Sequence, residues 1–270
     1  MNRRIEFVYP NDTYPVSLTG RDCSLNCKHC GKYYLSFMKT MEDISSIKDK
    51  KSFLISGGSD KKGRVPIKKH LEFLRDLKKQ GYRLNLHTGL IDKSLLDDIK
   101  PIADSVSFDF LTDKETINEV YSLDVNPAKY YELLESMLSK GINAVPHVTI
   151  GIHGGKIKGE YDAIRALKDL PCREVILIIF MPTKGTFYED RAPVPVMEVS
   201  KLFYYARKSL SNKRVTLGCM RPRGNYRYLT DISAINNYFD KVVMPHPKAR
   251  EHAKERKMDI VEKYECCAIV

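Results

Sequence analysis

The sequence contains 270 residues, 45 of them Lys or Arg and 34 Asp or Glu, so its formal net charge is +11. A hydrophobic content of 43% is enough for a sizeable core and excludes a wholly disordered chain. No apolar run approaches the ~18 residues of a membrane helix, and the first residues lack the apolar stretch of a secretory signal. The odd number of cysteines, seven, is typical of a reducing cytoplasm and favours metal binding, catalysis or burial over a disulfide scaffold.

Short apolar segments alternate with segments of helical period along most of the chain. The expected strands are, in order, Val16–Thr19, Ser52–Ser56, Leu84–Thr88, Ser105–Phe110, Ala144–Ile152, Glu174–Phe180, Val215–Cys219 and Lys241–Met244. The expected long helices between them are Pro66–Gln80, Pro127–Lys140, Glu160–Leu170 and Val196–Leu210. In the first of these, apolar residues recur every three or four positions, Pro66 stands at the start, and Gly81 follows the end.

Strands that alternate with helices of this length form βαβ units with a parallel sheet. Eight such units in 270 residues match a (β/α)8 TIM-type barrel, for which ~250 residues is typical. An open doubly wound sheet is the alternative. We expect one barrel domain over residues 1–245, followed by a C-terminal extension of one helix and a tail over residues 246–270. In a barrel, functional residues lie at the carboxyl ends of the strands.

Three cysteines follow the first expected strand within eight residues. Cys23, Cys27 and Cys30 have the spacing C-x3-C-x2-C, which allows one loop to place three thiolates around an iron–sulfur cluster. With only three local ligands, a [4Fe–4S] cluster keeps one iron open for an exchangeable ligand. Structural zinc is the alternative, but it usually takes two pairs of ligands, and the sequence has no second pair of that spacing. Cys172, between a helix and a strand, is expected to be structural.

This motif resembles that of the radical S-adenosylmethionine superfamily. The resemblance implies that the open iron binds S-adenosylmethionine, and that one electron cleaves this cofactor to a 5′-deoxyadenosyl radical that abstracts hydrogen from a substrate. The family has an aromatic residue near adenine just before the third cysteine, where this sequence has His29. Gly57 and Gly58, after the second expected strand, match the family's segment that meets the methionyl amine.

Later strand ends extend the resemblance. Ser107 and Asp109 share one face of the fourth expected strand, where a carboxylate could accept from both ribose hydroxyls; a helix cap or a solvated loop acid is the alternative. Ile150 opens a glycine-rich segment that resembles the family's fifth-strand segment near adenine. Residues 180–186 resemble the Pro-x-x-Gly-Thr segment of the biotin synthase and lipoyl synthase branch.

Three further cysteines suggest a second metal site. Cys219 ends the seventh expected strand, where biotin synthase-like proteins carry an arginine that faces an auxiliary cluster. A tail that only metal or a partner would order could bring Cys266 and Cys267 to an auxiliary [4Fe–4S] cluster. Exposed thiols at a frayed end, or lipidation of Cys267, are the alternatives. His87 and His147 are expected either to line the barrel mouth or to pack in the core.

The resemblance implies a cytoplasmic radical S-adenosylmethionine enzyme of the biotin synthase-like group, similar to the smaller proteins of archaeal two-subunit lipoyl synthases. Such an enzyme inserts sulfur into unactivated C–H bonds of a protein-bound octanoyl chain. A positive surface suits an acidic lipoyl-carrier protein as substrate, and a second synthase subunit is the expected partner. Methylthiolation and small-molecule sulfur insertion are the nearest alternatives. The alternative of another class is a zinc-containing nucleic-acid-binding protein. The dispersal of the basic residues along the chain argues against it.

Overall fold

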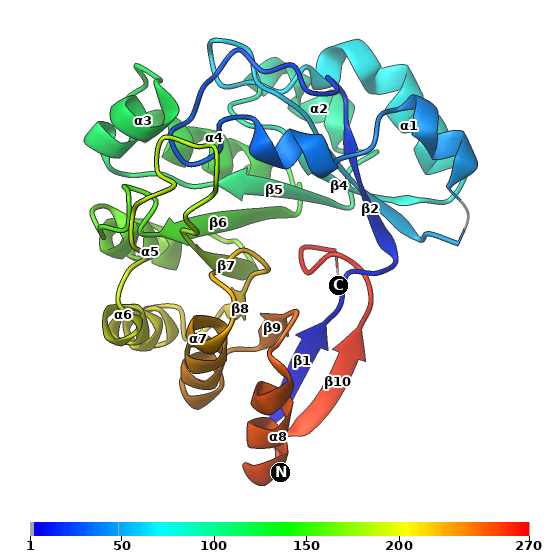
Figure 1. Ribbon diagram of the computed structural model, residues 1–270. Helices are drawn as coiled ribbons and strands as arrows, with labels where there is room; N and C mark the ends of the chain where they lie inside the picture. The colour runs from blue at the N-terminus through cyan, green and yellow to red at the C-terminus, as the bar shows by residue number, and fades with distance from the viewer. Residues whose placement is uncertain (1–2, 48, 270) are drawn as a thin grey trace.

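The computed structural model describes residues 3–47 and 49–269. Within them, one ten-stranded parallel sheet curls around a central space, and helices pack on its outer face (Figure 1). The strands are β1 (Arg4–Val8), β2 (Thr13–Ser17), β3 (Ser52–Ser56), β4 (Arg83–His87), β5 (Ser105–Asp109), β6 (Ala144–Ile150), β7 (Glu174–Ile179), β8 (Arg214–Leu217), β9 (Lys241–Val243) and β10 (Asp259–Lys263). The α-helices are α1 (Leu71–Lys79), α2 (Leu96–Ile99), α3 (Lys114–Tyr121), α4 (Ala128–Ser139), α5 (Glu160–Asp169), α6 (Val196–Ser209), α7 (Asn225–Asn236) and α8 (Pro247–Glu255). The 3-10 helices are η1 (Tyr33–Phe37), η2 (Glu42–Ser46), η3 (Ile67–His70) and η4 (Lys93–Leu95).

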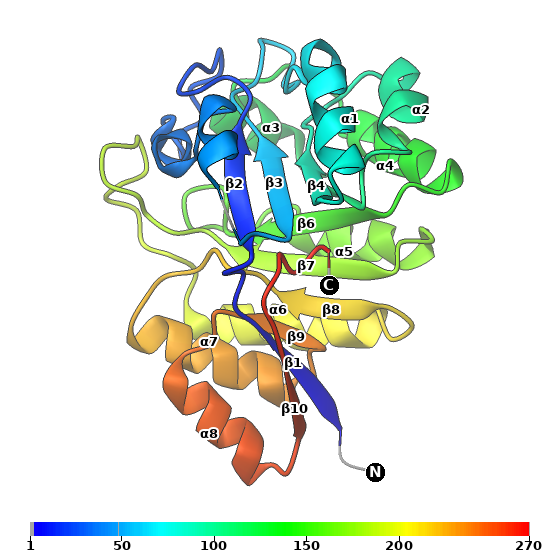
Figure 2. The ribbon, with the colours of Figure 1, turned by 90° about the vertical axis from the view of Figure 1, so that its right-hand side faces the viewer.

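The parallel α/β barrel class predicted from the alternation is confirmed, but the sheet does not close. Its strand order is β10-β1-β9-β8-β7-β6-β5-β4-β3-β2, so β10 and β2 are its two edges in the described part of the chain. The fold is therefore a partial (β/α) barrel, and Figure 2 shows β2 and β10 at separate ends of the curl. All eight expected strands are present, as β2 to β9.

The sequence does not predict two of the strands, β1 and β10. They pair with each other in parallel, and β1 also pairs with β9. β1 has fully buried Ile5 and Phe7, whereas no residue of β10 is fully buried, as is usual for a charged edge strand. The helix expected after residue 245 is α8, with Pro247 in its first turn. No helix among the described residues is long and apolar enough to cross a membrane.

The segment after β10 turns into the interior of the barrel, as Figure 1 and Figure 2 show. There Cys267 and Ala268 are buried. Their apolar neighbours, all from strands, are Val8, Val145, Ile176 and Val243. The expectation that only metal or a partner would order this tail is wrong, because the inner face of the sheet supplies an apolar surface for it.

Polar contacts fix the same tail. The buried Lys241 Nζ pairs with Glu174 at 2.9 Å and donates to the carbonyl of Cys267 at 2.7 Å. The backbone N–H of Cys266 donates to Thr13 Oγ1 at 2.7 Å. Burying a charged ammonium costs free energy unless it is paired and hydrogen-bonded, so these bonds make the tail part of the fold.

A fully buried ion pair joins the last helices to the sheet. Arg221 and Asp231 side chains are both 0% exposed, and Arg221 Nε donates to Asp231 Oδ1 at 2.8 Å. Arg221 also donates to the carbonyl of Gly218, after β8, and Asp231 accepts from the N–H of His246, before α8. Burial lowers the pKa of Arg221 and raises that of Asp231, which shows that each charge depends on the other.

We predict that Asp231→Ala lowers the free energy of unfolding by about 3–5 kcal/mol, because it leaves the guanidinium buried and unpaired. Urea denaturation followed by circular dichroism measures this change. The matched control is Asp190→Ala, at an exposed position, which should leave the unfolding midpoint nearly unchanged. Equal midpoints for the two variants would contradict the structural role given to the pair.

Candidate active site

The loop that carries the three cysteines follows β2 and is fixed by backbone hydrogen bonds. The N–H groups of Cys30 and Gly31 both donate to the carbonyl of Cys27 at 2.9 Å, which makes a tight turn between the second and third cysteines. Lys28 connects this turn to its surroundings. Its N–H donates to the carbonyl of Val120 at 2.9 Å, and its carbonyl accepts from the N–H of Tyr188 at 3.1 Å. The loop is thus held between the end of α3 and the segment after β7.

The end of β3 packs directly against the first cysteine. A Cβ atom on Gly58 would lie 1.8 Å from the carbonyl oxygen of Asp22 and 2.6 Å from Cys23 Cα, so only glycine fits there. The N–H of Ser59 donates to Cys23 Sγ at 3.2 Å. Gly57 precedes this contact, and the Gly-Gly pair therefore places the end of β3 beside the cysteine loop.

A cavity of about 240 Å³ lies at this edge of the sheet. Its lining contains most of the residues singled out from the sequence, namely Cys23, Cys27, His29, Cys30, Gly57, Gly58 and Asp109. Ser107 and Ile150 are not among the lining residues. Ser107 is buried and hydrogen-bonded to Asn85, whereas the Ile150 side chain is 0% exposed in the hydrophobic core. Neither side chain is therefore part of the wall of this cavity.

Asp109 is the negative charge of this cavity, and histidines surround it. His87 Nε2 lies 3.4 Å from Asp109 Oδ2, and the His87 and His147 rings stack with centroids 6.3 Å apart. Burial alone would raise the pKa of Asp109, but His87, His147 and His29 outweigh it and lower that pKa to about 2. Burial would lower the pKa of His87, but Asp109 outweighs it and raises that pKa. The two groups therefore stabilise each other's charge.

His29 presents a free ring nitrogen at the cavity. Its Nδ1 is buried and has no hydrogen-bond partner, and burial lowers the pKa of the ring to about 4. Its edge packs on Tyr121, with ring centroids 5.2 Å apart. Tyr121 and Tyr130 also line the cavity, and no pattern in the sequence marked them, because they come from the end of α3 and the start of α4. A buried polar atom without a partner is costly, so this wall fits a ligand with a polar group.

The cysteines themselves fit an iron–sulfur cluster. Burial, with Cys30 and Cys23 nearby, raises the pKa of Cys27 to about 12, so three thiolates here need a cationic group. Among the described residues, only one set of three ligand atoms lies within 4.8 Å of one another, and it lies elsewhere. The three sulfurs are thus spread more widely than on one zinc ion, whose Zn–S bonds of about 2.3 Å keep thiolates within about 4.6 Å. In a [4Fe–4S] cluster each thiolate binds its own iron.

Inside the barrel, the tail brings two more cysteines near Cys219. Cys266 Sγ accepts from Asn85 Nδ2 at 3.3 Å. The neighbouring Cys267 thiol outweighs burial and, with Asn85 and Lys241, lowers the pKa of Cys266 to about 7. Cys219 is exposed to solvent after β8, but the protein around its thiol raises the pKa by desolvation and the charge of Cys266 raises it further, so the two thiols are within electrostatic reach. Cys172, in contrast, is buried in the main core, as its expected structural role requires.

No sequence profile of a protein family matches the chain, and no curated protein matches it. Solved structures with the same fold exist. Methylornithine synthase (PylB) shares a TM-score of 0.67 at 13% identity, over 96% of this chain and 84% of its own. The [FeFe]-hydrogenase maturase HydG has a TM-score of 0.66 at 15% identity. SuiB of Streptococcus suis bound to S-adenosylmethionine has a TM-score of 0.55 at 15% identity. This chain spans 57% of the length of HydG and 58% of that of SuiB, with 89% and 97% of this chain covered. The chain therefore has the partial (β/α) barrel that these structures share.

The ion pair between His87 and Asp109 generates a prediction about pH. The pKa of His87 is raised from its ordinary value of 6.5, and that of Asp109 is lowered from its ordinary value of 3.8. The ion pair therefore stabilises the fold most between pH 3.8 and pH 6.5. Its contribution is lost as pH rises through the raised pKa of His87, or as pH falls through about 2. We predict that Asp109→Asn lowers the pKa of His87 below its ordinary value, because burial, the largest influence on the ring, is then opposed only by the charge of Cys266.

Histidine NMR titration of the metal-free protein measures this pKa. The control is Asp162→Asn, which removes an exposed carboxylate on α5 and should leave the His87 titration unchanged. A His87 pKa that does not move in Asp109→Asn would mean that the two side chains do not interact in solution.

Proposed function

We propose that this protein is a radical S-adenosylmethionine enzyme. In this proposal Cys23, Cys27 and Cys30 hold a [4Fe–4S] cluster with one open iron, and the cavity beside them binds S-adenosylmethionine. The observation that carries the proposal is the contact of the cysteine loop with Gly58, since only a glycine allows the end of β3 to approach Cys23 so closely. The shared fold supports it.

When bound, the cluster and S-adenosylmethionine supply a carbon radical that can take hydrogen from an unactivated C–H bond. The chain's own residues bind and orient the cofactor. The backbone carbonyls of Gly57 and Gly58 accept from the methionyl ammonium group. Asp109, whose pKa of about 2 keeps it ionised at neutral pH, accepts from the ribose hydroxyls. His29, neutral at this pH, offers a ring and an unpartnered nitrogen to the adenine.

The barrel itself protects this chemistry from water. A carbon radical reacts with whatever hydrogen donor reaches it, so a site of this kind benefits from a closed interior. Cys267 and Ala268 fill the space between the inner faces of β1, β6, β7 and β9. The tail thereby fills the interior behind the cavity, since Cys266 contacts Asn85, two residues before the cavity-lining His87.

Within this class, we propose sulfur insertion into a protein-bound octanoyl chain, with Cys219, Cys266 and Cys267 as ligands of an auxiliary [4Fe–4S] cluster that donates the sulfur. The convergence of these cysteines, from two distant segments, supports this finer proposal. An acidic carrier protein as substrate and a second synthase subunit belong to the same proposal, and the net charge of +11 supports an acidic partner. Without an auxiliary cluster to donate sulfur, a radical reaction that inserts no sulfur would be the better assignment.

The main proposal predicts that Cys23→Ala, Cys27→Ala and Cys30→Ala each lose the cluster and S-adenosylmethionine cleavage together. Iron and sulfide analysis and anaerobic detection of 5′-deoxyadenosine measure these two properties. Cys172→Ala is the matched control, because it removes a thiol from the core without touching the loop. Cleavage that persists in all three loop variants would refute the radical mechanism, and zinc in place of iron would favour the alternative of another class.

The finer proposal predicts that Cys219→Ala and Cys266→Ala reduce iron from about eight to about four atoms per chain. Both variants should still cleave S-adenosylmethionine but should no longer insert sulfur into an octanoylated carrier. Single substitutions are preferable to removal of the tail, since Cys267 and Ala268 are part of the packed interior. Iron content that is unchanged in both variants would exclude a second cluster at these residues.

A further inference from the structure

A second group of ligand-type side chains lies outside the cavity. Glu115 and Glu119 are one turn apart on α3, and His153 lies in the loop after β6. His153 Nε2 is 3.5 Å from Glu119 Oε2 and 3.7 Å from Glu115 Oε1. These three atoms lie within 4.8 Å of one another, and in the described part of the chain no other set of three such ligand atoms does.

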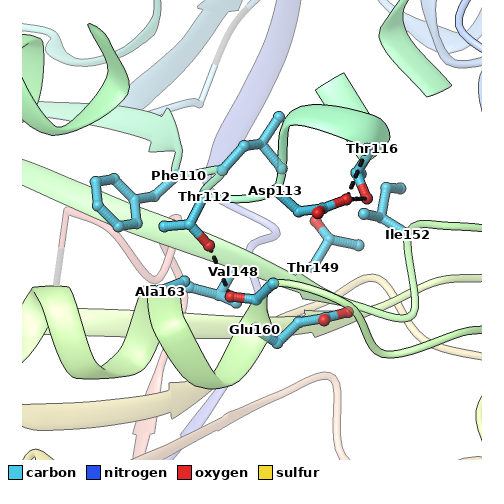
Figure 3. Close-up of a pocket in the computed structure, with 11 residues that line it drawn as sticks. Phe110, Thr112, Asp113, Thr116, Val148, Thr149, Ile152, Glu160 and Ala163 are labelled. Atoms are coloured by element: carbon cyan, nitrogen blue, oxygen red, sulfur yellow. Dashed lines mark hydrogen bonds between the residues drawn. The ribbon is translucent and has the colours of Figure 1, made fainter. Parts of the chain in front are cut away.

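A chain of hydrogen bonds fixes the proton on the His153 ring. Asp113 Oδ2 accepts from the N–H of Thr116 at 2.7 Å and from its hydroxyl at 2.6 Å (Figure 3). Since the hydroxyl has given its one proton to Asp113, its 3.2 Å contact with His153 Nδ1 requires Nδ1 to donate. In the neutral ring, Nε2 then carries a lone pair. That nitrogen has no hydrogen bond to any described residue, and His153 is only 8% exposed.

The outer oxygens of both glutamates already have partners. Lys158 Nζ pairs with Glu115 Oε2 at 2.5 Å. Lys28 Nζ at 3.0 Å and the Tyr188 hydroxyl at 3.2 Å both donate to Glu119 Oε1. The two remaining oxygens, Glu115 Oε1 and Glu119 Oε2, face the lone pair of His153. When Nε2 is unprotonated, these three atoms are electron-pair donors that converge on one point, and a metal ion or a proton between them removes their repulsion.

We propose that Glu115, Glu119 and His153 bind one divalent transition-metal ion, for which zinc is the best match. Two carboxylate oxygens and one imidazole nitrogen are a ligand set that zinc accepts, with water in the fourth position. The glutamate side chains are 60% and 40% exposed, so the ion can enter from solvent. Thr116 and Asp113 orient the imidazole from behind, as outer hydrogen-bond partners of metal-bound histidines do. This site is independent of the function proposed above.

Such an ion would connect three parts of the structure. It would join α3 to the loop after β6, and Glu119 also holds Lys28, which stands between Cys27 and His29. The ion would therefore restrain the loop that carries the cysteines without being part of the cavity. A ligand that binds only the folded state also raises its stability.

Calorimetric titration of the anaerobically cluster-loaded protein with zinc tests the proposal. We expect one zinc ion per chain beyond any bound by free cysteines, and zinc X-ray absorption should show N and O ligands of this ion at about 2.0–2.2 Å. Glu115→Gln and His153→Gln should abolish this site. Thr116→Val should weaken it by about 10- to 100-fold, the range for outer-shell groups. Glu132→Gln, which changes an exposed glutamate on α4, is the matched control and should bind zinc normally.

Zinc that is absent, that binds only through sulfur at about 2.3 Å, or that binds equally well to Glu115→Gln would overturn the proposal. Circular dichroism checks that each variant is folded. If His153→Gln does not fold, Glu115→Gln decides the question alone, because its side chain is exposed and its loss cannot disturb the core.

Discussion

All strands of the sheet run in the same direction, and the candidate active site depends on this constraint. The carboxyl ends of parallel strands meet at one edge, so residues that follow different strands become neighbours. The cysteine loop follows β2, Gly57 and Gly58 follow β3, His87 ends β4 and Asp109 ends β5. These strands are adjacent in the order β5-β4-β3-β2. Short loops and strand ends, spread over some 90 residues of sequence, thus form the wall of one cavity without any special long-range contact.

The same constraint explains why much of the site could be predicted from the sequence. Motif spacing and strand ends are local properties, and the alternation of strands and helices then fixes where these ends meet. How deeply a residue lies within the barrel, in contrast, is not a local property of the sequence. Ser107 and Asp109 share a face of β5, as the period of two requires, but Ser107 lies deeper and is hydrogen-bonded to Asn85. Tyr121 and Tyr130 reach the cavity from helices, where no motif identifies them.

The fold could be predicted except at its two ends. β1 is short and begins at the second of two arginines, and β10 lies in a charged stretch, so neither has the apolar run that identified β3 or β7. β1 and β10 pair with each other in parallel although they lie near opposite ends of the chain. Neither strand can therefore be recognised from its own segment alone. The tail shows the same limit, because only the curled sheet provides the apolar surface that buries Cys267. A sequence pattern cannot indicate a surface that exists only after the barrel has formed.

The buried tail also determines the order in which the molecule can be completed. Asn85 and Cys266 are 181 residues apart, and Thr13 and Cys266 are 253 apart. During synthesis, β2 to β8 emerge from the ribosome before β9, β10 and the residues that fill the interior. The nascent barrel therefore has an unfilled apolar interior, and contacts of such long sequence separation form slowly. Until residues 265–269 arrive, the cysteine loop stands over an open channel, so chaperones or assembly factors would meet a different surface from that of the finished protein.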